Sequence, residues 1–260
     1  MEKTLIIGAG EIGTSLGNVL SSVYEVVYDD IRFEKHPDGN FNTLNICYPY
    51  SDKFVEITKN YINKYQPKLT IIHSTVRVGT TRKLGKGVVY SPINGRHPHL
   101  ELSIKTFIKF IGGISGEDTY SASEFFRVAG IKTIIFSSSE ATEFAKIFCT
   151  TYYGWNLIFT KEMVKLCEEN NLPFHEVYTI WNNVYNEGYM KLNESRFLRP
   201  VLLPMKGEIG GHCVIPNCDL FDSSLTKVVK QFNATYKEVS NEDLSSRKKC
   251  YPDKGNRQRK

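Results

Sequence analysis

The 260-residue sequence predicts an α/β fold, in which a doubly wound, mainly parallel sheet is followed by an all-helical domain built on one long helix. Three observations support this prediction. A glycine-rich turn follows a short apolar run at the N-terminus, strand-like and helix-like segments alternate through the first half, and one apolar helical stripe occupies 140–169. Alternating strands and helices are typical of a parallel sheet covered on both faces.

The N-terminal segment predicts a Rossmann-like dinucleotide-binding unit. An apolar run, 4–7, leads into a GxGxxG turn, and a second β-rich run, 24–28, ends in two acids. The first glycine makes the tight turn, the second lets the backbone approach a pyrophosphate, and the third lets the helix pack on the sheet. An acid about 20 residues after the first glycine binds the ribose 2′-hydroxyl. The residues expected to bind the cofactor are Gly8, Gly10, Glu11, Ile12, Gly13 and Asp30.

The expected cofactor is NAD. A carboxylate at Asp30 would repel the 2′-phosphate of NADP. Arg32, two residues later, opposes this preference.

The remaining elements follow from periodicity. Apolar and β-branched runs predict further strands at 44–47, 69–73, 87–90, 109–112 and 133–136, with helices near 52–64 and 120–128. From 140 to 169 aromatic and aliphatic residues recur every three or four positions, which predicts a helix of roughly eight turns. A helix from 173 to about 190, a loop rich in proline and glycine over 199–216, and a last helix over 219–236 complete the pattern.

Three segments are therefore expected. Residues 1–138 form the dinucleotide-binding domain, residues 139–236 form a helical central domain, and residues 237–260 form a basic tail. A long apolar helix needs a partner along its length, which can be other helices or a second subunit. We expect a homodimer through the helix 140–169.

Composition and charge exclude several classes of protein. No apolar run approaches 18 residues and the N-terminal run has four, so neither a membrane span nor a signal peptide is expected. The six cysteines form no CxxC pair and no standard zinc pattern, which favours a reducing cytoplasm and predicts no metal site. The segment 245–260 carries a net charge of +6 and the remaining 244 residues carry −1. This basic tail is expected to be disordered and solvated, and no nucleic-acid partner is expected.

Two loops after strands carry side chains that could contact a small-molecule substrate or the cofactor. Ser74 and Thr75 follow the strand 69–73, at the edge of a parallel sheet where ligands bind. Arg96 and His97 follow the strand 87–90, and arginine offers paired donors to a phosphate or carboxylate. The alternatives are a hydroxyl-rich helix cap for the first loop and a solvated surface loop for the second.

Two further segments carry candidate catalytic groups. Lys146 and Thr150 lie one turn apart on the same face of the long helix, where a lysine can stabilise negative charge or relay a proton. Cys213 follows two glycines and His212, at a turn where a thiolate could attack an aldehyde. The alternatives are a surface lysine and an inert buried cysteine.

Together these motifs resemble the UDP-glucose/GDP-mannose dehydrogenase family over residues 4–221. The segment 74–81 is similar to the family's STVPVGTT, 143–146 to its helix motif that ends in the catalytic lysine, and 210–213 to its GGHC. The resemblance implies that a sugar-nucleotide alcohol is oxidised to a carboxylate with two NAD⁺, through an aldehyde, a cysteine thiohemiacetal and a thioester. It implies a catalytic site of Thr75, Lys146, Thr150, Cys213 and Asn217, and we add Arg96, His97 and His212 as substrate contacts.

The sequence departs from the family pattern at three positions. Ile93 stands where the family has a glutamate, Thr150 where it has an asparagine, and Asn217 where it has an aspartate. The loss of a general base weakens thioester hydrolysis most. The family's C-terminal nucleotide-sugar domain is also not expected, so the chain resembles a short form. Three functions remain open: oxidation of a sugar-like or hydroxy-acid primary alcohol, a single-step hydroxyacid-type dehydrogenase, and a non-catalytic NAD-binding protein derived from the family.

Overall fold

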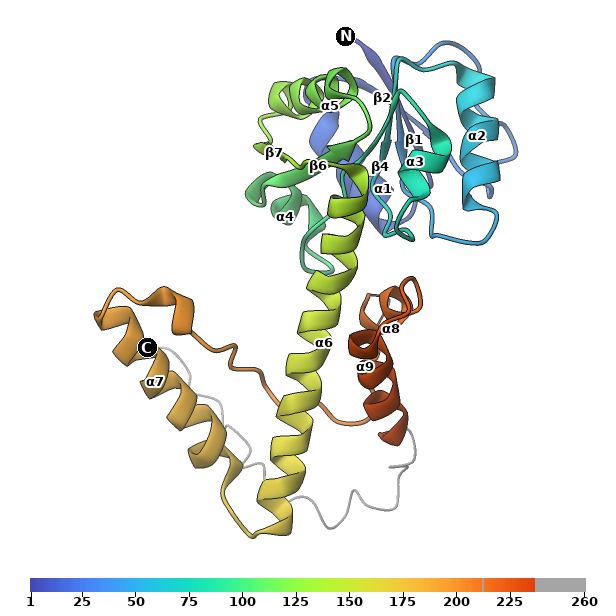
Figure 1. The fold of residues 1–260 in the computed structure, drawn as a ribbon. Coiled ribbons are helices and arrows are strands. Elements are labelled where there is room, and N and C mark those ends of the chain that lie inside the picture. The colour runs from blue at the N-terminus through green and yellow to red at the C-terminus, as the bar shows by residue number, and fades with distance from the viewer. Residues whose placement is uncertain (212, 237–260) are drawn as a thin grey trace, which may run out of the picture. The chain divides into compact units, whose positions relative to one another are not determined.

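The computed structural model describes residues 1–211 and 213–236 (Figure 1). It confirms the predicted fold class, because a seven-stranded, mostly parallel sheet with flanking helices is followed by a helical region. The chain divides into two compact units, Met1–Phe148 and Cys149–Lys260. His212 and the predicted tail 237–260 lie outside the described residues.

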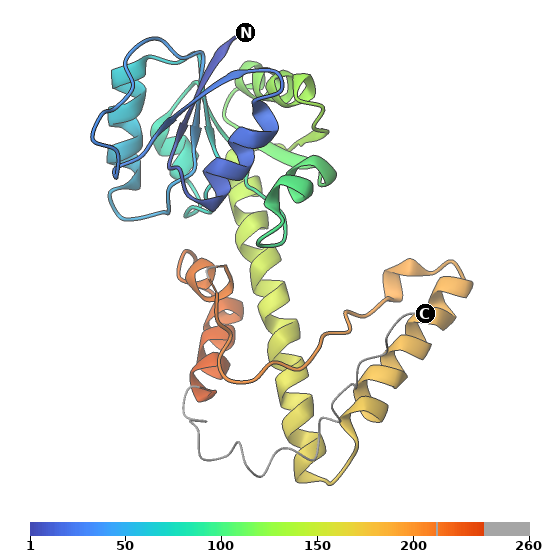
Figure 2. The same ribbon diagram turned by 180° about the vertical axis from the view of Figure 1, so that it is seen from behind.

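The sheet has the order β2-β1-β3-β4-β5-β6-β7, and its strands are seen from two sides in Figures 1 and 2. All pairs are parallel except β5 with β6, which is antiparallel. The amino end of β6 therefore lies at the edge where β1 to β5 have their carboxyl ends. The bounds are β1 Lys3–Ile7, β2 Glu25–Asp29, β3 Thr43–Ile46, β4 Leu69–Ile72, β5 Val88–Tyr90, β6 Lys109–Gly113 and β7 Thr133–Ile135.

Helices cover both faces of the sheet. Since successive strand residues point to opposite faces, alternate residues of one strand pack against different helices. Ile6 packs in one apolar cluster with residues of α1 (Glu11–Leu20), α4 (Leu100–Thr106) and α5 (Gly116–Val128). Its neighbours in β1 pack in the other cluster with α2 (Phe54–Tyr65) and α3 (Thr80–Leu84). The short helices α3 and α4, of five and seven residues, were not predicted, since they are too short to show a helical period.

The helical unit is built around α6, a helix that runs without a break from Ser139 to Glu169. A Cβ on Gly154 would lie 2.7 Å from Val214 and 3.1 Å from Val229, which explains a glycine inside this helix. The predicted helix 173–190 is present as a π-helical segment, η1, and α7. The further bounds are η1 His175–Ile180, α7 Trp181–Lys191, the 3₁₀ turn η2 Ser195–Phe197, α8 Val214–Cys218 and α9 Ser224–Thr235.

Two sequence predictions in this unit need correction. The loop predicted for 199–216 ends early, because α8 begins at Val214. The last helix begins at Ser224 instead of 219, since Ser223 forms a capping box with Thr226. Among the described residues, no helix is both long and apolar enough to cross a membrane.

Candidate active site

The glycine-rich turn contains two glycines that the fold itself requires. Gly8 has a φ of +100°, and a Cβ there would lie 2.8 Å from the Tyr48 nitrogen. A Cβ on Gly13 would overlap the Gly8 carbonyl oxygen. Gly10, the N-cap of α1, differs, because a Cβ there would meet no described atom within 4 Å. A glycine that packing does not require fits a ligand that approaches the backbone at a helix N-terminus, where N–H groups attract phosphate.

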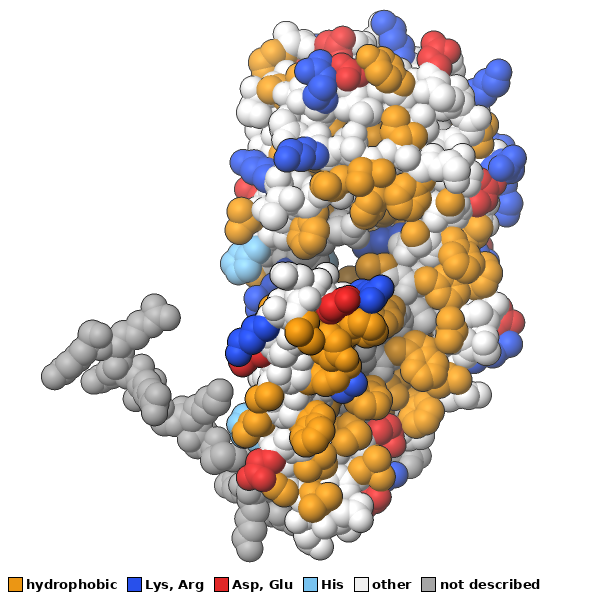
Figure 3. Space-filling model, turned by 60° about the vertical axis from the view of Figure 1, so that its left-hand side comes forward, with side chains coloured by type: hydrophobic (Ala, Val, Ile, Leu, Met, Phe, Trp, Pro, Cys, Tyr) orange, Lys and Arg blue, Asp and Glu red, His pale blue; other side chains and the backbone are white. Residues whose placement is uncertain are grey.

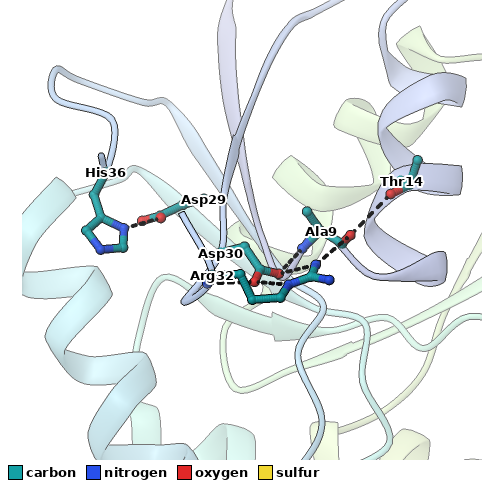
Figure 4. A network of polar contacts seen from close by, with 6 residues as sticks. All are labelled: Ala9, Thr14, Asp29, Asp30, Arg32 and His36. Atoms are coloured by element: carbon teal, nitrogen blue, oxygen red, sulfur yellow. Dashed lines mark hydrogen bonds and ion pairs between the residues drawn. The ribbon is translucent and has the colours of Figure 1, made fainter. Parts of the chain in front are cut away.

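Asp30 lies beside this turn and is held by several donors (Figure 4). Its Oδ2 accepts a hydrogen bond from the Ala9 nitrogen at 2.8 Å, and the Arg32 guanidinium pairs with both carboxylate oxygens. The Arg32 side-chain hydrogen bonds hold the pKa of Asp30 well below its usual range, against the opposing effect of burial. The predicted ribose-binding acid therefore lies at the turn and is engaged within the chain.

The predicted loop 74–81 is joined to the start of α6 by Glu143. This carboxylate is fully buried and accepts hydrogen bonds from the Gly79 nitrogen at 2.5 Å and from the nitrogen and hydroxyl of Thr81 at 2.8 and 2.7 Å. Burial raises the pKa of Glu143, and these hydrogen bonds oppose that rise. Ser74 is buried and donates to a carbonyl of the loop after β3, while Thr75 beside it is half-buried.

Lys146 lies on the same helix, α6, about one turn after Glu143. Its amine donates to the Ile93 carbonyl at 2.7 Å and to the Asn94 side-chain oxygen at 3.1 Å. Both acceptors belong to the loop that follows β5, at the carboxyl edge of the sheet. The predicted catalytic lysine is therefore oriented by the loop that carries Ile93.

A second lysine, which the sequence analysis did not single out, lies beneath the same loop. Lys109 is 4% exposed, and its amine donates to the Ser91 and Pro92 carbonyls at 2.9 and 3.2 Å. It also lies 3.4 Å from Nδ1 of His73, whose Nε2 lies 3.0 Å from the Asn45 side-chain oxygen. Burial lowers the pKa of Lys109 to about 7 and also lowers the pKa of His73. No periodicity signals this cluster, since its members come from two strands, β3 and β6, and from the loops after β4 and β5.

The predicted substrate loop is exposed and contacts the glycine-rich turn. His97 Nδ1 lies 2.8 Å from a carboxylate oxygen of Glu11, so a predicted substrate residue and a predicted cofactor residue are brought together. The main-chain nitrogen of Arg96 donates to the Ser103 hydroxyl in α4, and the Arg96 side chain is exposed. Ile12, the other predicted residue here, is half-buried at the start of α1.

In the helical unit the structure brings together Asn217 and Thr150. The Asn217 amide donates to the Thr150 hydroxyl at 3.1 Å, and Asn217 is buried. Cys213 is exposed and occupies the N-cap position of α8 without a side-chain capping hydrogen bond, whereas Cys218 at the end of α8 is buried. The two positions at which the resemblance leads one to expect a carboxylate thus carry an apolar side chain in a buried cluster, Ile93, and an amide already engaged by a hydroxyl, Asn217.

The loop before Cys213 is anchored by two buried polar side chains. The Lys161 amine donates to the Met205 carbonyl at 2.7 Å and to the Gly207 carbonyl at 2.5 Å. The Asn233 side-chain oxygen accepts from the Ile209 nitrogen at 2.5 Å. Neither residue was predicted, because the partners are 24 to 46 residues apart in the chain. No cluster of three or more metal-binding side chains occurs among the residues that the structure describes.

Comparisons with known proteins give a match only at the level of structure. No family model matches the sequence, and no curated protein matches it. The UDP-D-ManNAc dehydrogenase of Pyrococcus horikoshii has a TM-score of 0.74 at 19% identity, over 90% of this chain and 68% of that one.

Two further solved structures are similar. The 3-hydroxyisobutyrate dehydrogenase of Mycobacterium tuberculosis has a TM-score of 0.68 at 14% identity, over 91% of this chain and 94% of that one. The UDP-glucose dehydrogenase of Pyrobaculum islandicum has a TM-score of 0.67 at 13% identity, over 90% of this chain and 68% of that one. At such identities the similarity establishes the fold that this chain shares with sugar-nucleotide and hydroxyacid dehydrogenases.

Proposed function

We propose that this chain is an NAD-dependent oxidoreductase that oxidises a primary alcohol of a sugar-like or hydroxy-acid substrate. One observation carries the proposal. The backbone around Gly10 and the amine of Lys146 both lie at the carboxyl edge of the parallel sheet, where open α/β folds bind ligands. The similarity in fold to solved dehydrogenases supports the same reaction class.

The proposed roles follow from the chemistry of each side chain. The N-terminus of α1 would hold the dinucleotide pyrophosphate at Gly10, and the bound nicotinamide would supply a hydride acceptor. Lys146 would stabilise the negative charge on the substrate oxygen as its proton leaves, because a cation fixed by two acceptors needs little reorganisation. Thr75, in the loop that Glu143 fixes, would donate or accept a hydrogen bond at the substrate hydroxyl.

Cys213 would carry the second half of the reaction. Its thiolate sulfur would add to the carbonyl carbon of the aldehyde product, giving a thiohemiacetal whose C–H bond can again release hydride. Loss of that hydride gives a thioester, and attack of water releases the carboxylate and restores the thiol. The sum is two hydrides and two NAD⁺ for each alcohol.

A second candidate is a single oxidation that stops at the carbonyl. It is supported by the side chains at positions 93 and 217, where the resemblance leads one to expect a carboxylate that could help water attack a thioester. Ile93 is buried in an apolar cluster and Asn217 donates its amide to Thr150, so neither side chain can accept a proton from water. In this reaction Cys213 has no covalent role.

The two candidates separate on stoichiometry. We expect two NADH for each alcohol oxidised, measured with a panel of UDP-sugars, sugar acids and hydroxy acids. Cys213→Ser should then stop at one NADH with trapped aldehyde, whereas Cys149→Ser, at another exposed cysteine, should leave two. One NADH in the wild type that Cys213→Ser does not change would support the single oxidation. Dinucleotide binding with no turnover on the panel would support a non-catalytic protein.

A homodimer through α6 is part of this proposal. Hydrophobic side chains gather on the surface of the helical unit (Figure 3), and on α6 Tyr152, Phe159 and Leu166 are 62%, 59% and 49% exposed. Apolar faces of this kind are typical of subunit interfaces. We expect a dimer by light scattering, a monomer for Phe159→Glu, and an unchanged mass for Leu102→Glu at an exposed leucine of α4. A monomeric wild type at micromolar concentration would contradict the proposal.

A further inference from the structure

The carboxylate of Asp30 has no acceptor capacity left for a ribose. Its Oδ1 accepts from the main-chain nitrogen and Nε of Arg32, at 3.1 and 2.6 Å, and its Oδ2 accepts from the Ala9 nitrogen and Nη2 of Arg32, at 2.8 and 3.0 Å. Two carboxylate oxygens offer about four lone-pair sites, and four donors use them. A ribose hydroxyl can donate to Asp30 only if it displaces one of these donors.

Arg32 presents the opposite chemistry at the same place. Its Nη2 also donates to the Ala9 carbonyl at 3.1 Å, so the guanidinium is fixed at the turn by three side-chain hydrogen bonds (Figure 4). Its Nη1 has no hydrogen-bond partner within residues 1–211 and 213–236, and the side chain is 67% exposed. A fixed guanidinium with donors directed outward suits a phosphate, since its planar fork matches phosphate oxygens.

The neighbouring acid does not cancel this preference. The carboxylate of Asp29 is fully buried and lies 2.6 Å from Nδ1 of His36, with the Tyr65 hydroxyl donating to its other oxygen at 3.2 Å. Asp29 is therefore enclosed by its own partners. The exposed group that a ligand would meet at the end of β2 is the guanidinium of Arg32.

We infer that Arg32 determines how the adenosine ribose is recognised, and that the site accepts the 2′-phosphorylated dinucleotide NADP(H) as well as NAD(H). The inference rests on the proposed dinucleotide site. It adds a specificity-determining residue that the glycine-rich turn alone does not reveal, and it relaxes the preference for NAD over NADP that the acid at position 30 predicts.

The test measures the dissociation constants of NADH and NADPH by titration calorimetry for the wild type and Arg32→Gln. Hydrogen bonds to a charged group are worth roughly ten- to a hundredfold in affinity. We expect the ratio of the NADPH constant to the NADH constant to rise at least tenfold in Arg32→Gln, with NADH bound as tightly or more tightly because Asp30 is released for the ribose. Thermal melts of each variant establish that it is folded.

Arg127→Gln is the matched control, because Arg127 is an exposed arginine that pairs with Glu124 on α5 through three hydrogen bonds. Its ratio should equal that of the wild type. A rise below tenfold in Arg32→Gln, or an equal rise in Arg127→Gln, would overturn the inference while NADH binding leaves the proposed function intact. If folded wild type binds neither dinucleotide, the proposed function fails first.

Discussion

Replacement of the buried Lys109 by methionine should change how stability depends on pH. In the folded chain, burial lowers the pKa of Lys109 from 10.5 to about 7. In the unfolded chain the amine is in water and keeps its proton to higher pH. Between these two values folding therefore releases a proton, so the free energy of unfolding of the wild type rises as the pH rises. Below the folded pKa the amine is charged in both states, and the cost of burying it no longer changes.

The size of this effect follows from the two pKa values. One pKa unit corresponds to about 1.4 kcal/mol, and linkage over the interval from about pH 7 to about pH 9 gives about 2 kcal/mol. Lys109→Met also leaves the Ser91 and Pro92 carbonyls without this donor, which shifts stability by an amount that does not depend on pH. The prediction therefore concerns the pH dependence of stability. From about pH 7 to about pH 9, the free energy of unfolding of the wild type rises by about 2 kcal/mol relative to that of Lys109→Met.

Urea unfolding followed by circular dichroism at the two pH values measures the difference. The comparison with the variant removes the contribution of other titrating groups, and Lys105→Met serves as the control for losing an exposed lysine of α4. The reasoning is refuted if the free energy of unfolding of the wild type minus that of Lys109→Met stays constant or falls between about pH 7 and about pH 9.

Three further predictions concern the turn and the anchors. Gly10→Ala should melt like the wild type yet bind NADH at least tenfold more weakly. Gly13→Ala should lose about 1–3 kcal/mol of stability, because its Cβ overlaps the backbone. Equal melting temperatures for the two variants would contradict these different roles of the two glycines. Glu143→Gln should destabilise the fold by about 1–3 kcal/mol in urea, since one of its oxygens becomes a donor facing donors, and an unchanged midpoint would refute this. Lys161→Met should lower the free energy of unfolding, measured with urea by tryptophan fluorescence, by about 1–3 kcal/mol, because two loop carbonyls lose their donor. An unchanged free energy would show that the loop is held by other contacts.

The candidate site was predictable where its signal is local. The turn at 8–13 and the acid at position 30 follow one another within a single βαβ unit, so spacing alone places them. The motif around Lys146 and the cysteine at position 213 were singled out in the same way. The helices α3 and α4 were missed because five and seven residues are too few to show a period.

The sequence by itself determined the α/β class, the order of the strands and of the longer helices, and the glycine-rich turn, because all of these depend on residues close together in the chain. Only the tertiary structure decided which groups meet. The antiparallel pairing of β6 carries Lys109 to the carboxyl edge, 36 residues from His73, and no local pattern encodes that approach. The same holds for Asp30: its position in the sequence predicts a ribose acceptor, whereas the fold of the turn directs four donors onto its two oxygens and leaves the Arg32 side chain exposed beside them.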